Sequence, residues 1–283
     1  MDVSIVVLTW EDFERTNGCV KSLPPDAEII VVDNGSAAEI SAALRAMCDE
    51  TGARYVRSET NLGYAKGMNL GVRHSTRSRV ILSNNDIVVQ PGAIEKLLAR
   101  LDDPAVGAAF PKVLDVTGKD QTAAGRFLTV ATGLGHATGL SVLFPRLRIV
   151  STPEHGDWLS GPFVAIRRQT LDEIGGVDES SFFYSEDLRL CWAIRRRGLR
   201  LAYVPEAVVT HEDDASAKVR WGAEEISRRQ TREFIRASRE LAGWRGTIAC
   251  SAYTFGVLLR AVVGGGPARR AVARGALEGM STR

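Results

Sequence analysis

Residues 29–36 read IIVVDNGS, and this stretch contains the pattern that decides the fold. Its run of β-branched apolar residues is too short for a helix pattern and is typical of a strand buried on both faces. The run ends at Asp33, and Asn34-Gly35-Ser36 is a turn signal. The stretch therefore predicts a buried strand whose carboxyl end carries polar side chains.

Other stretches repeat this pattern. Residues 4–9 read SIVVLT, and the apolar residues 80–82 end at Ser83-Asn84-Asn85-Asp86. Residues 53–56 predict a further strand, and helical segments fill the gaps at residues 11–23, 38–51, 67–75 and 92–101. Strands that alternate with helices predict an α/β fold with a mostly parallel sheet flanked by helices.

The pattern weakens further along the chain. Gly133, Gly135 and Gly139 interrupt residues 107–151, which predicts irregular strands and a loop. Periodicity returns at residues 158–166. We expect helices at residues 170–174 and 185–197, and short strands at residues 201–204 and 207–209.

The segment after His211 has a different character. Residues 223–241 predict a helix with one apolar face. Residues 247–263 are apolar, but they include Arg260 and fall short of the roughly 20 apolar residues that a membrane span needs. A basic segment, residues 267–274, follows. Two interpretations are open: packed helices that complete the fold, or amphipathic attachment to the inner membrane surface.

Composition restricts the class of protein. The chain has 283 residues, 45% hydrophobic and 25% charged, which is ordinary for a globular protein and unlike a disordered one. A net charge of +2 gives no indication of nucleic-acid binding. The four cysteines include no Cys-x-x-Cys pair, which disfavours a zinc site or a disulfide framework and suits a reducing cytoplasm. No basic region precedes the first apolar stretch, so we expect no signal peptide.

Polar residues at the ends of the predicted strands indicate a shared ligand site. In open α/β sheets, ligands bind beyond the carboxyl ends of the strands, where Thr9 and Asp33 lie. Asn84-Asn85-Asp86 offers oxygen ligands that suit Mg²⁺ or Mn²⁺, although the same residue types also mark ordinary turns.

Residues 61–71 read NLGYAKGMNLG and place glycines around the start of a short helix. Glycine permits close approach of the backbone to a ligand, a helix N-terminus attracts phosphate, and Lys66 adds a positive charge. The spacing matches neither the dinucleotide-binding Gly-x-Gly-x-x-Gly pattern nor a P-loop. A purely structural turn is the alternative.

Two further groups bear chemistry. Glu186 and Asp187 follow three aromatic residues at a predicted helix start, where they either cap the helix or provide a partly desolvated general base. His211 follows a predicted strand and precedes a cluster of acids. It is either a structural histidine or a neutral imidazole ligand for a metal.

Taken in order, these segments resemble the family 2 glycosyltransferases with the GT-A fold, and within them the rhamnosyltransferase-like enzymes of cell-surface polysaccharide synthesis. The matching stretches are residues 4–10, 31–36, 61–71, 82–86, 158–168, 175–187 and 204–211. The resemblance implies a Rossmann-like nucleotide-sugar-binding half at residues 1–105, an acceptor-binding and catalytic half at residues 106–222, and a helical extension at residues 223–283.

The resemblance also implies roles for individual residues. Asp187 matches the catalytic base of a Glu-Asp pair whose first member is Glu186. Asp86 matches the metal-binding last acid of an Asp-x-Asp motif, and His211 matches a histidine that completes the metal site. The implied donor contacts are Thr9, Trp10, Asp33, Asn61, Gly63, Lys66, Asn84 and Asn85, and the implied acceptor contacts are Trp158 and Gly161. Since Asn84 replaces the first acid of Asp-x-Asp, the metal has fewer protein carboxylates.

These roles imply an inverting glycosyltransferase that uses Mg²⁺ or Mn²⁺ to move a sugar from a uridine or thymidine diphosphate donor to a hydroxyl group. The acceptor is a glycan, a lipid-linked saccharide or a natural-product intermediate, including one held on a carrier protein. We expect a cytoplasmic protein, with contact to the inner face of the cell membrane through the basic C-terminal helices as the further alternative.

Two rival functions are a sugar-phosphate nucleotidyltransferase and a non-catalytic nucleotide-sugar-binding domain. The first would carry a Gly-x-Gly-Thr-Arg signature after the first strand, where this chain has Thr9-Trp10-Glu11-Asp12. The second could dispense with Asp187 and His211, so the presence of both residues favours an enzyme.

Overall fold

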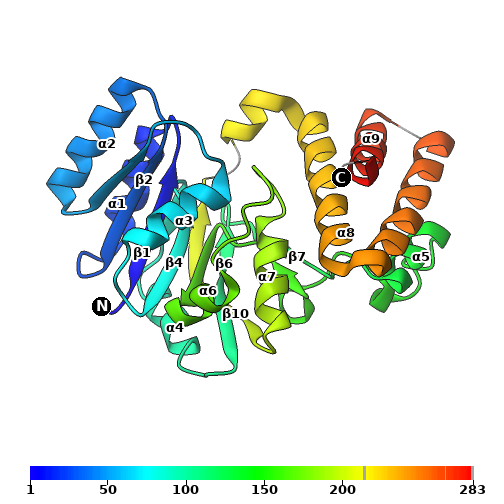
Figure 1. Ribbon diagram of the computed structural model, residues 1–283, viewed down its shortest axis with the longest axis horizontal. Helices are drawn as coiled ribbons and strands as arrows, with labels where there is room; N and C mark the ends of the chain where they lie inside the picture. Colours follow the sequence, from blue (N-terminus) through cyan, green and yellow to red (C-terminus); the bar gives the residue numbers. More distant parts are fainter. Residues whose placement is uncertain (213–214, 265, 282–283) are drawn as a thin grey trace. The chain divides into compact units, whose positions relative to one another are not determined.

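The computed structural model describes residues 1–212, 215–264 and 266–281 (Figure 1). The chain forms two compact units. Unit 1 comprises Met1–Thr122, Leu159–Glu186 and Ala193–Asp213, and unit 2 comprises Ala123–Trp158, Asp187–Trp192 and Asp214–Arg283.

Unit 1 is built on a mixed sheet with the strand order β3-β2-β1-β4-β9-β6-β10-β5. The strands are β1 (Ser4–Thr9), β2 (Glu28–Asn34), β3 (Arg54–Ser58), β4 (Arg79–Asn84), β5 (Ile87–Val89), β6 (Val106–Leu114), β9 (Phe163–Arg167) and β10 (Arg200–His211). β3, β2, β1 and β4 run parallel, as does β6 with β10, whereas β9 is antiparallel to β4 and β6. The parallel strands carry their carboxyl ends to one edge of the sheet.

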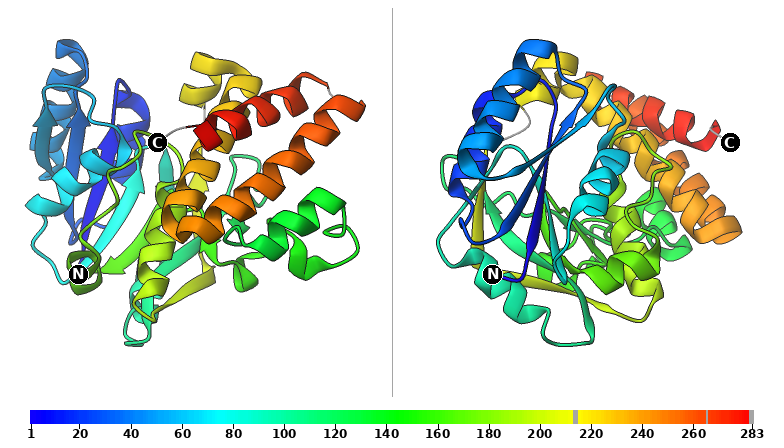
Figure 2. Two further views of the ribbon diagram at one scale, coloured as in Figure 1. Left: turned by 45° about the vertical axis from the view of Figure 1, so that its right-hand side comes forward. Right: turned by 60° about the vertical axis from the view of Figure 1, so that its left-hand side comes forward.

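Helices cover both faces of this sheet (Figures 1 and 2). They are α1 (Phe13–Ser22), α2 (Ala38–Thr51), α3 (Tyr64–His74), α4 (Ala93–Arg100) and α6 (Arg168–Ile174), while α7 (Glu186–Arg196) contributes Asp187–Trp192 to unit 2. Side chains of β1 alternate between the faces. Ile5 and Val7 join the core with residues of α1 and α2, and Leu8 points to α3. Gly67 of α3 permits this contact, since a Cβ there would lie 2.5 Å from Leu8 Cδ1.

The predicted α/β class and most predicted elements are confirmed. α3 begins at Tyr64, earlier than expected, so residues 61–63 lead directly into its N-terminus. The two short strands expected after residue 200 are one strand, β10, with a register shift between Val204 and Val208. A bulge of this kind interrupts the ladder without ending the strand, which explains the break in the apolar pattern.

The expectation of irregular structure at residues 107–151 is wrong in two places. β6 is a regular, largely buried strand, and residues 130–138 form helix α5 (Val130–Thr138) with a capping box at Thr129. Gly133 is compatible with this helix because it faces the backbone of α8, where a larger residue would collide with the Ala249 carbonyl. Gly133 thus marks close helix packing, whereas Gly139, at φ 77°, ends the helix.

Unit 2 consists mainly of α5, α8 (Ala215–Gly264) and α9 (Pro267–Ser281). Non-helical φ and ψ angles at Gly222 and Gly243 divide α8, and the part after Gly243 packs against α5. Small residues allow close approach here too, since a Cβ on Gly256 would lie 2.5 Å from Ala137 Cα. The C-terminal segment is therefore a set of packed helices. By length and composition alone, residues 222–264 form a helix that could cross a membrane, contrary to the expectation that this segment falls short.

Candidate active site

The turn after β4 and the end of β10 bring Asp86 and His211 together. β5 begins directly after Asp86 and pairs antiparallel with β10, with Ile87 opposite His211. This register places His211 Nε2 3.2 Å from Asp86 Oδ2, and the two side chains are only 16% and 18% exposed. The Asp86 carbonyl also accepts a hydrogen bond of 2.9 Å from the Glu212 amide. Both predicted metal ligands thus lie side by side.

The chemistry of this pair suits a divalent cation. Asp86 Oδ1 is buried and accepts no hydrogen bond from any residue that the structure describes. A buried carboxylate oxygen without a donor is costly, and a cation would satisfy it. Carboxylate and imidazole both bind Mn²⁺, and carboxylate binds Mg²⁺. No group of three or more His, Cys, Asp or Glu side chains gathers for a metal among the described residues, so phosphate or water oxygens would have to complete the coordination.

Arg15 of α1 adds a positive charge beside these acids, and sequence reasoning missed it. Its Nη1 lies 2.6 Å from Asp12 Oδ2, and its Nε lies 3.8 Å from Glu212 Oε2. The hydrogen bond to Asp12 raises the pKa of Arg15 against the effect of burial, and the charges of Asp12, Asp86 and Glu212 add to the rise. Nothing in the sequence marked Arg15, because its position depends on where α1 packs.

Asp33, at the end of β2, is fully buried. Its Oδ1 accepts a hydrogen bond from the Ser36 amide at 2.9 Å, and its Oδ2 accepts bonds from Ser41 Oγ at 2.5 Å and the Tyr55 hydroxyl at 2.7 Å. Burial alone would raise the pKa of Asp33, but these hydrogen bonds outweigh it and lower the pKa. Asp33 therefore organises the loop after β2 as an ionised group, and its contact with a nucleoside stays a prediction.

The polar side chains at the ends of β1 and β4 bond to each other. Asn85 Nδ2 lies 3.3 Å from Thr9 Oγ1 and 3.2 Å from Thr16 Oγ1. Thr9 is 1% exposed, so its hydroxyl serves this network, whereas Trp10 next to it is 38% exposed. Glu11 at φ 57° joins the loops after β1 and β2, because its Oε1 accepts a 2.9 Å hydrogen bond from the Ala37 amide. Glu11 is a second residue that sequence reasoning missed.

Asn34 holds the segment that contains Asn61 and Gly63. Its Nδ2 donates to Asn61 Oδ1 and to the Gly63 carbonyl, both at 3.2 Å, and its Oδ1 accepts from the Leu62 amide at 3.0 Å. Asn34 is 3% exposed, so these bonds are shielded from water. Asn34, which the sequence marks as a turn residue, thus holds the predicted donor segment in place. Lys66 in the first turn of α3 is exposed and pairs with no acid of the described chain.

The donor segment also touches the aromatic stretch before α7. The Tyr64 amide donates to the Phe182 carbonyl at 3.0 Å, and Gly63 adopts φ 82° and ψ 178° directly against it. A Cβ on Gly63 would lie 2.6 Å from that carbonyl oxygen. The sequence predicted neither contact, because residues 63 and 182 are brought together only by the fold.

Strained backbone precedes Glu186 and Asp187. Tyr184 and Ser185 both have positive φ, at 75° and 68°, which is uncommon for residues other than glycine. Ser181 Oγ donates to the Tyr184 carbonyl at 2.9 Å and holds this turn in place. α7 starts at Glu186, with Asp187 in its first turn. Glu186 belongs to unit 1 and Asp187 to unit 2.

The two predicted acceptor residues also fall in different units. Gly161 precedes Pro162, whose carbonyl accepts a 2.8 Å hydrogen bond from the Asn84 amide, so this segment borders the end of β4. Trp158 packs on Gly125 in unit 2, where a Cβ would lie 2.6 Å from Trp158 Cζ2. The Trp158 indole nitrogen is buried and makes no hydrogen bond with the described residues.

Comparison with known proteins identifies related sequences. The sequence model of glycosyl transferase family 2 matches residues 4–175. A low-salt glycan biosynthesis hexosyltransferase, Agl10 of Haloferax volcanii, is 26% identical over 204 residues, which is 71% of this chain and 64% of the relative. An N-acetylglucosaminyl-diphospho-decaprenol L-rhamnosyltransferase of Mycobacterium tuberculosis is 28% identical over 237 residues, which covers 76% of each chain.

Solved structures share the fold. The mannosyltransferase PcManGT of Pyrobaculum calidifontis, solved in complex with GDP-Man and Mn²⁺, matches with a TM-score of 0.59 at 18% sequence identity. The match covers 98% of this chain and 79% of that one. The fold is therefore of the GT-A type, as the sequence predicts.

Proposed function

The chain belongs to glycosyl transferase family 2, and we propose that it is an inverting, metal-assisted enzyme that uses a uridine or thymidine diphosphate sugar. The pairing of Asp86 with His211 carries this proposal. A buried acid oxygen without a hydrogen-bond donor, beside an imidazole and at the carboxyl edge of a nucleotide-binding sheet, suits a cation that binds diphosphate.

Donor binding is assigned to the strand ends and to the start of α3. Asp33 and Trp10 contact the nucleoside, and Asn84 and Asn85 contact the donor beside the metal ligands. Lys66, with its exposed amine, and the N-terminus of α3 after Asn61 and Gly63 offer positive charge to the phosphates. When bound, Mg²⁺ or Mn²⁺ supplies charge that stabilises the departing diphosphate.

Asp187 is assigned as the general base. It takes the proton of the acceptor hydroxyl, the hydroxyl oxygen forms a bond to the anomeric carbon, and the bond from that carbon to the diphosphate oxygen breaks on the opposite side. The configuration at the anomeric carbon is inverted, and no covalent sugar–enzyme species forms. The strained turn at Tyr184 and Ser185 supports a functional role for the acids that follow it, because strain concentrates at such sites.

The acceptor is assigned to the second half of the chain, with Trp158 and Gly161 in contact with it. The rhamnosyltransferase relative is named for a lipid-linked diphospho-saccharide, which supports an acceptor of that class over a carrier-protein-bound one. We assign residues 1–105 to donor binding, residues 106–222 to the acceptor and catalysis, and residues 223–283 to a helical extension. The four cysteines, which include no Cys-x-x-Cys pair, support a cytoplasmic location.

The product of donor breakdown tests this function without knowledge of the acceptor. The protein is incubated with UDP- and dTDP-sugars and Mn²⁺ or Mg²⁺, and nucleoside diphosphate and pyrophosphate are measured separately. We expect slow release of nucleoside diphosphate. A second incubation supplies nucleoside triphosphate and sugar phosphate, and release of pyrophosphate there would identify a nucleotidyltransferase instead. Donor binding without any hydrolysis or transfer would identify a non-catalytic binding domain.

A further inference from the structure

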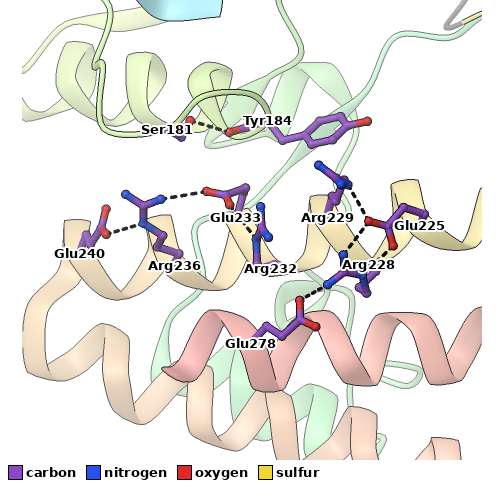
Figure 3. Close-up of polar contacts among 10 residues, drawn as sticks. All are labelled: Ser181, Tyr184, Glu225, Arg228, Arg229, Arg232, Glu233, Arg236, Glu240 and Glu278. Atoms are coloured by element: carbon purple, nitrogen blue, oxygen red, sulfur yellow. Dashed lines mark hydrogen bonds and ion pairs between the residues drawn. The ribbon is translucent and has the colours of Figure 1, made fainter. Parts of the chain in front are cut away.

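In the first part of α8, four arginines form ion pairs with Glu225, Glu233 and Glu240 (Figure 3). Glu225 accepts from Arg228 at 2.6 Å and from Arg229 at 2.7 Å, and these hydrogen bonds lower the pKa of Glu225 to about 2. Glu240 likewise accepts from Arg236 at 2.9 Å. Most of the positive charge of this part of the helix is therefore paired with acids, which include Glu278 of α9.

The rest of unit 2 is different, because two of its segments contain no acid at all. Residues 241–277 include five arginines and no Asp or Glu, and residues 121–153 include three arginines and no Asp or Glu. The fold packs these segments together. Arg260 Nη1 of α8 donates to the His136 carbonyl of α5 at 2.8 Å, and the His136 ring stacks on Tyr253 at a centroid distance of 4.4 Å. Positive charge from Arg148 and Arg260 thus lies around α5 and the end of α8, whereas Arg270 and Arg274 of α9 line a pocket together with Glu224 and Glu225.

The same part of α8 exposes a stripe of large apolar side chains. Its members recur at intervals of three, four or seven residues, which places them on one face of a helix. They are Trp244, Ile248, Phe255, Leu259 and Val262, and their exposure ranges from 46% to 85%. On the other side of the helix, Ala249, Cys250 and Val257 are buried against the neighbouring helices. α8 is thus amphipathic here, with an apolar face that nothing in the described chain covers.

The loop after α5 adds further exposed apolar residues. Val142, Leu143 and Phe144 are 74%, 72% and 55% exposed. Arg148 holds this loop, since its Nε donates to the Ser141 carbonyl and its Nη2 to the Val142 carbonyl, both at 3.1 Å. The loop presents its apolar side chains in a fixed backbone shape and follows directly from the α5 terminus that Arg260 contacts.

We propose that these two groups of apolar residues, with the arginines around them, bind the surface of an anionic lipid bilayer. Apolar side chains flanked by arginines without acids match the boundary between acyl chains and negatively charged headgroups. A second copy of this chain is a poor partner for the same face, because it would bring further arginines and no acids to pair with them. This binding is independent of the transfer chemistry.

The bilayer surface also fits better than a membrane crossing. A span formed by the end of α8 would have to leave α5, where Gly133 and Gly256 allow close contact between the helices. It would also detach Arg260 from the His136 carbonyl and place its charge in hydrocarbon. Peripheral binding keeps every one of these contacts.

Vesicle flotation of the full chain tests the proposal. We compare vesicles of phosphatidylglycerol and phosphatidylcholine with vesicles of phosphatidylcholine alone, at low and high salt. The variants Phe255→Glu/Leu259→Glu and Leu143→Glu/Phe144→Glu are each expected to weaken binding to the anionic vesicles by about tenfold or more, because each removes two apolar side chains from the bilayer. Val116→Glu is the matched control, since Val116 is 69% exposed but lies in unit 1.

The outcomes separate the alternatives. Melting temperature and donor hydrolysis should match wild type in all variants, which shows that they fold. Wild-type binding by either double variant, or equal binding to the two vesicle types, would overturn the proposal. Bound protein that alkaline carbonate does not release would also overturn the proposal, because it would indicate a membrane span. The proposal would fail as well if wild type formed an oligomer, the Phe255→Glu/Leu259→Glu variant did not, and neither bound vesicles.

Discussion

His211 Nε2 lies 3.2 Å from Asp86 Oδ2, although Asp86 lies in the turn between β4 and β5 and His211 is the last residue of β10. The antiparallel pairing of β5 with β10 sets this distance, because it places Ile87 opposite His211 and so brings the preceding Asp86 to the imidazole. A proposed metal site here therefore depends on strand register and not on a flexible loop.

The Gly63→Ala variant tests the contact between the donor segment and the stretch before α7. Gly63 occupies a backbone region that is essentially restricted to glycine, and an added Cβ would meet the Phe182 carbonyl oxygen. Gly52→Ala is the matched control, since Gly52 also has positive φ, at 73°, but has open space around it. Urea unfolding should show a loss of about 1–3 kcal/mol for Gly63→Ala and a smaller loss for Gly52→Ala. Equal losses would contradict the assigned contact.

Asn34→Ala should loosen the donor segment. The substitution removes the acceptor of the Leu62 amide, while Asn61 Oδ1 keeps its hydrogen bond from the Gly63 amide. Because Asn34 is only 3% exposed, loss of its bond to Leu62 typically costs about 1–3 kcal/mol. We expect weaker binding of nucleoside diphosphate by calorimetry together with lower stability. Ser58→Ala, which removes an exposed hydrogen bond to the Thr60 carbonyl, is the control. Unchanged binding in Asn34→Ala would show that the hydrogen bonds of Asn34 do not contribute to donor binding.

The sequence predicts a structural feature well when the residues that form it are close together in the chain, and poorly when they are far apart. The apolar runs at residues 4–9 and 29–33 predicted strands, because burial on both faces leaves a local signature. The resemblance supplied Asp86 and His211 as a pair. Arg15, Glu11 and the Gly63–Phe182 contact had no local signature, since each depends on how separate elements pack. Gly133 was wrongly taken to interrupt regular structure. The feature that requires a glycine there is the backbone of α8, which is distant in the sequence.

His136 should make stability depend on pH. Burial, and to a smaller extent the charge of Arg260, lowers the pKa of His136 to about 4 from its ordinary 6.5. The unfolded chain therefore binds the proton more readily than the folded protein. The contribution of His136 is fully present above about pH 6.5 and is lost as the pH falls toward 4.

The measurement is urea unfolding at intervals from pH 7 to pH 4. His136→Gln should reduce the slope of stability against pH, whatever it does to stability at pH 7. His155→Gln is the control, because His155 is exposed, and it should keep the wild-type slope. An unchanged slope in His136→Gln would contradict the assigned protonation.

Asp187→Asn should separate binding from catalysis. The amide keeps the shape of the side chain but cannot take a proton, so we expect donor affinity near that of wild type and transfer slower by roughly 10²–10⁴-fold. Steady-state kinetics with the donor and any accepted acceptor would give both values. Glu186→Gln is the neighbouring comparison and should keep more activity. A larger loss in Glu186→Gln than in Asp187→Asn would move the base to Glu186.

The most direct test of the central claim is calorimetry of nucleoside diphosphate binding with Mn²⁺ and with EDTA, in wild type and in Asp86→Ala. Glu95→Gln, an exposed acid of α4, is the control. We predict that wild type and the control bind at least about tenfold more tightly with Mn²⁺, and that Asp86→Ala loses this difference. Equal binding by wild type with Mn²⁺ and with EDTA, or a full metal effect in Asp86→Ala, would contradict a metal site at Asp86 and His211.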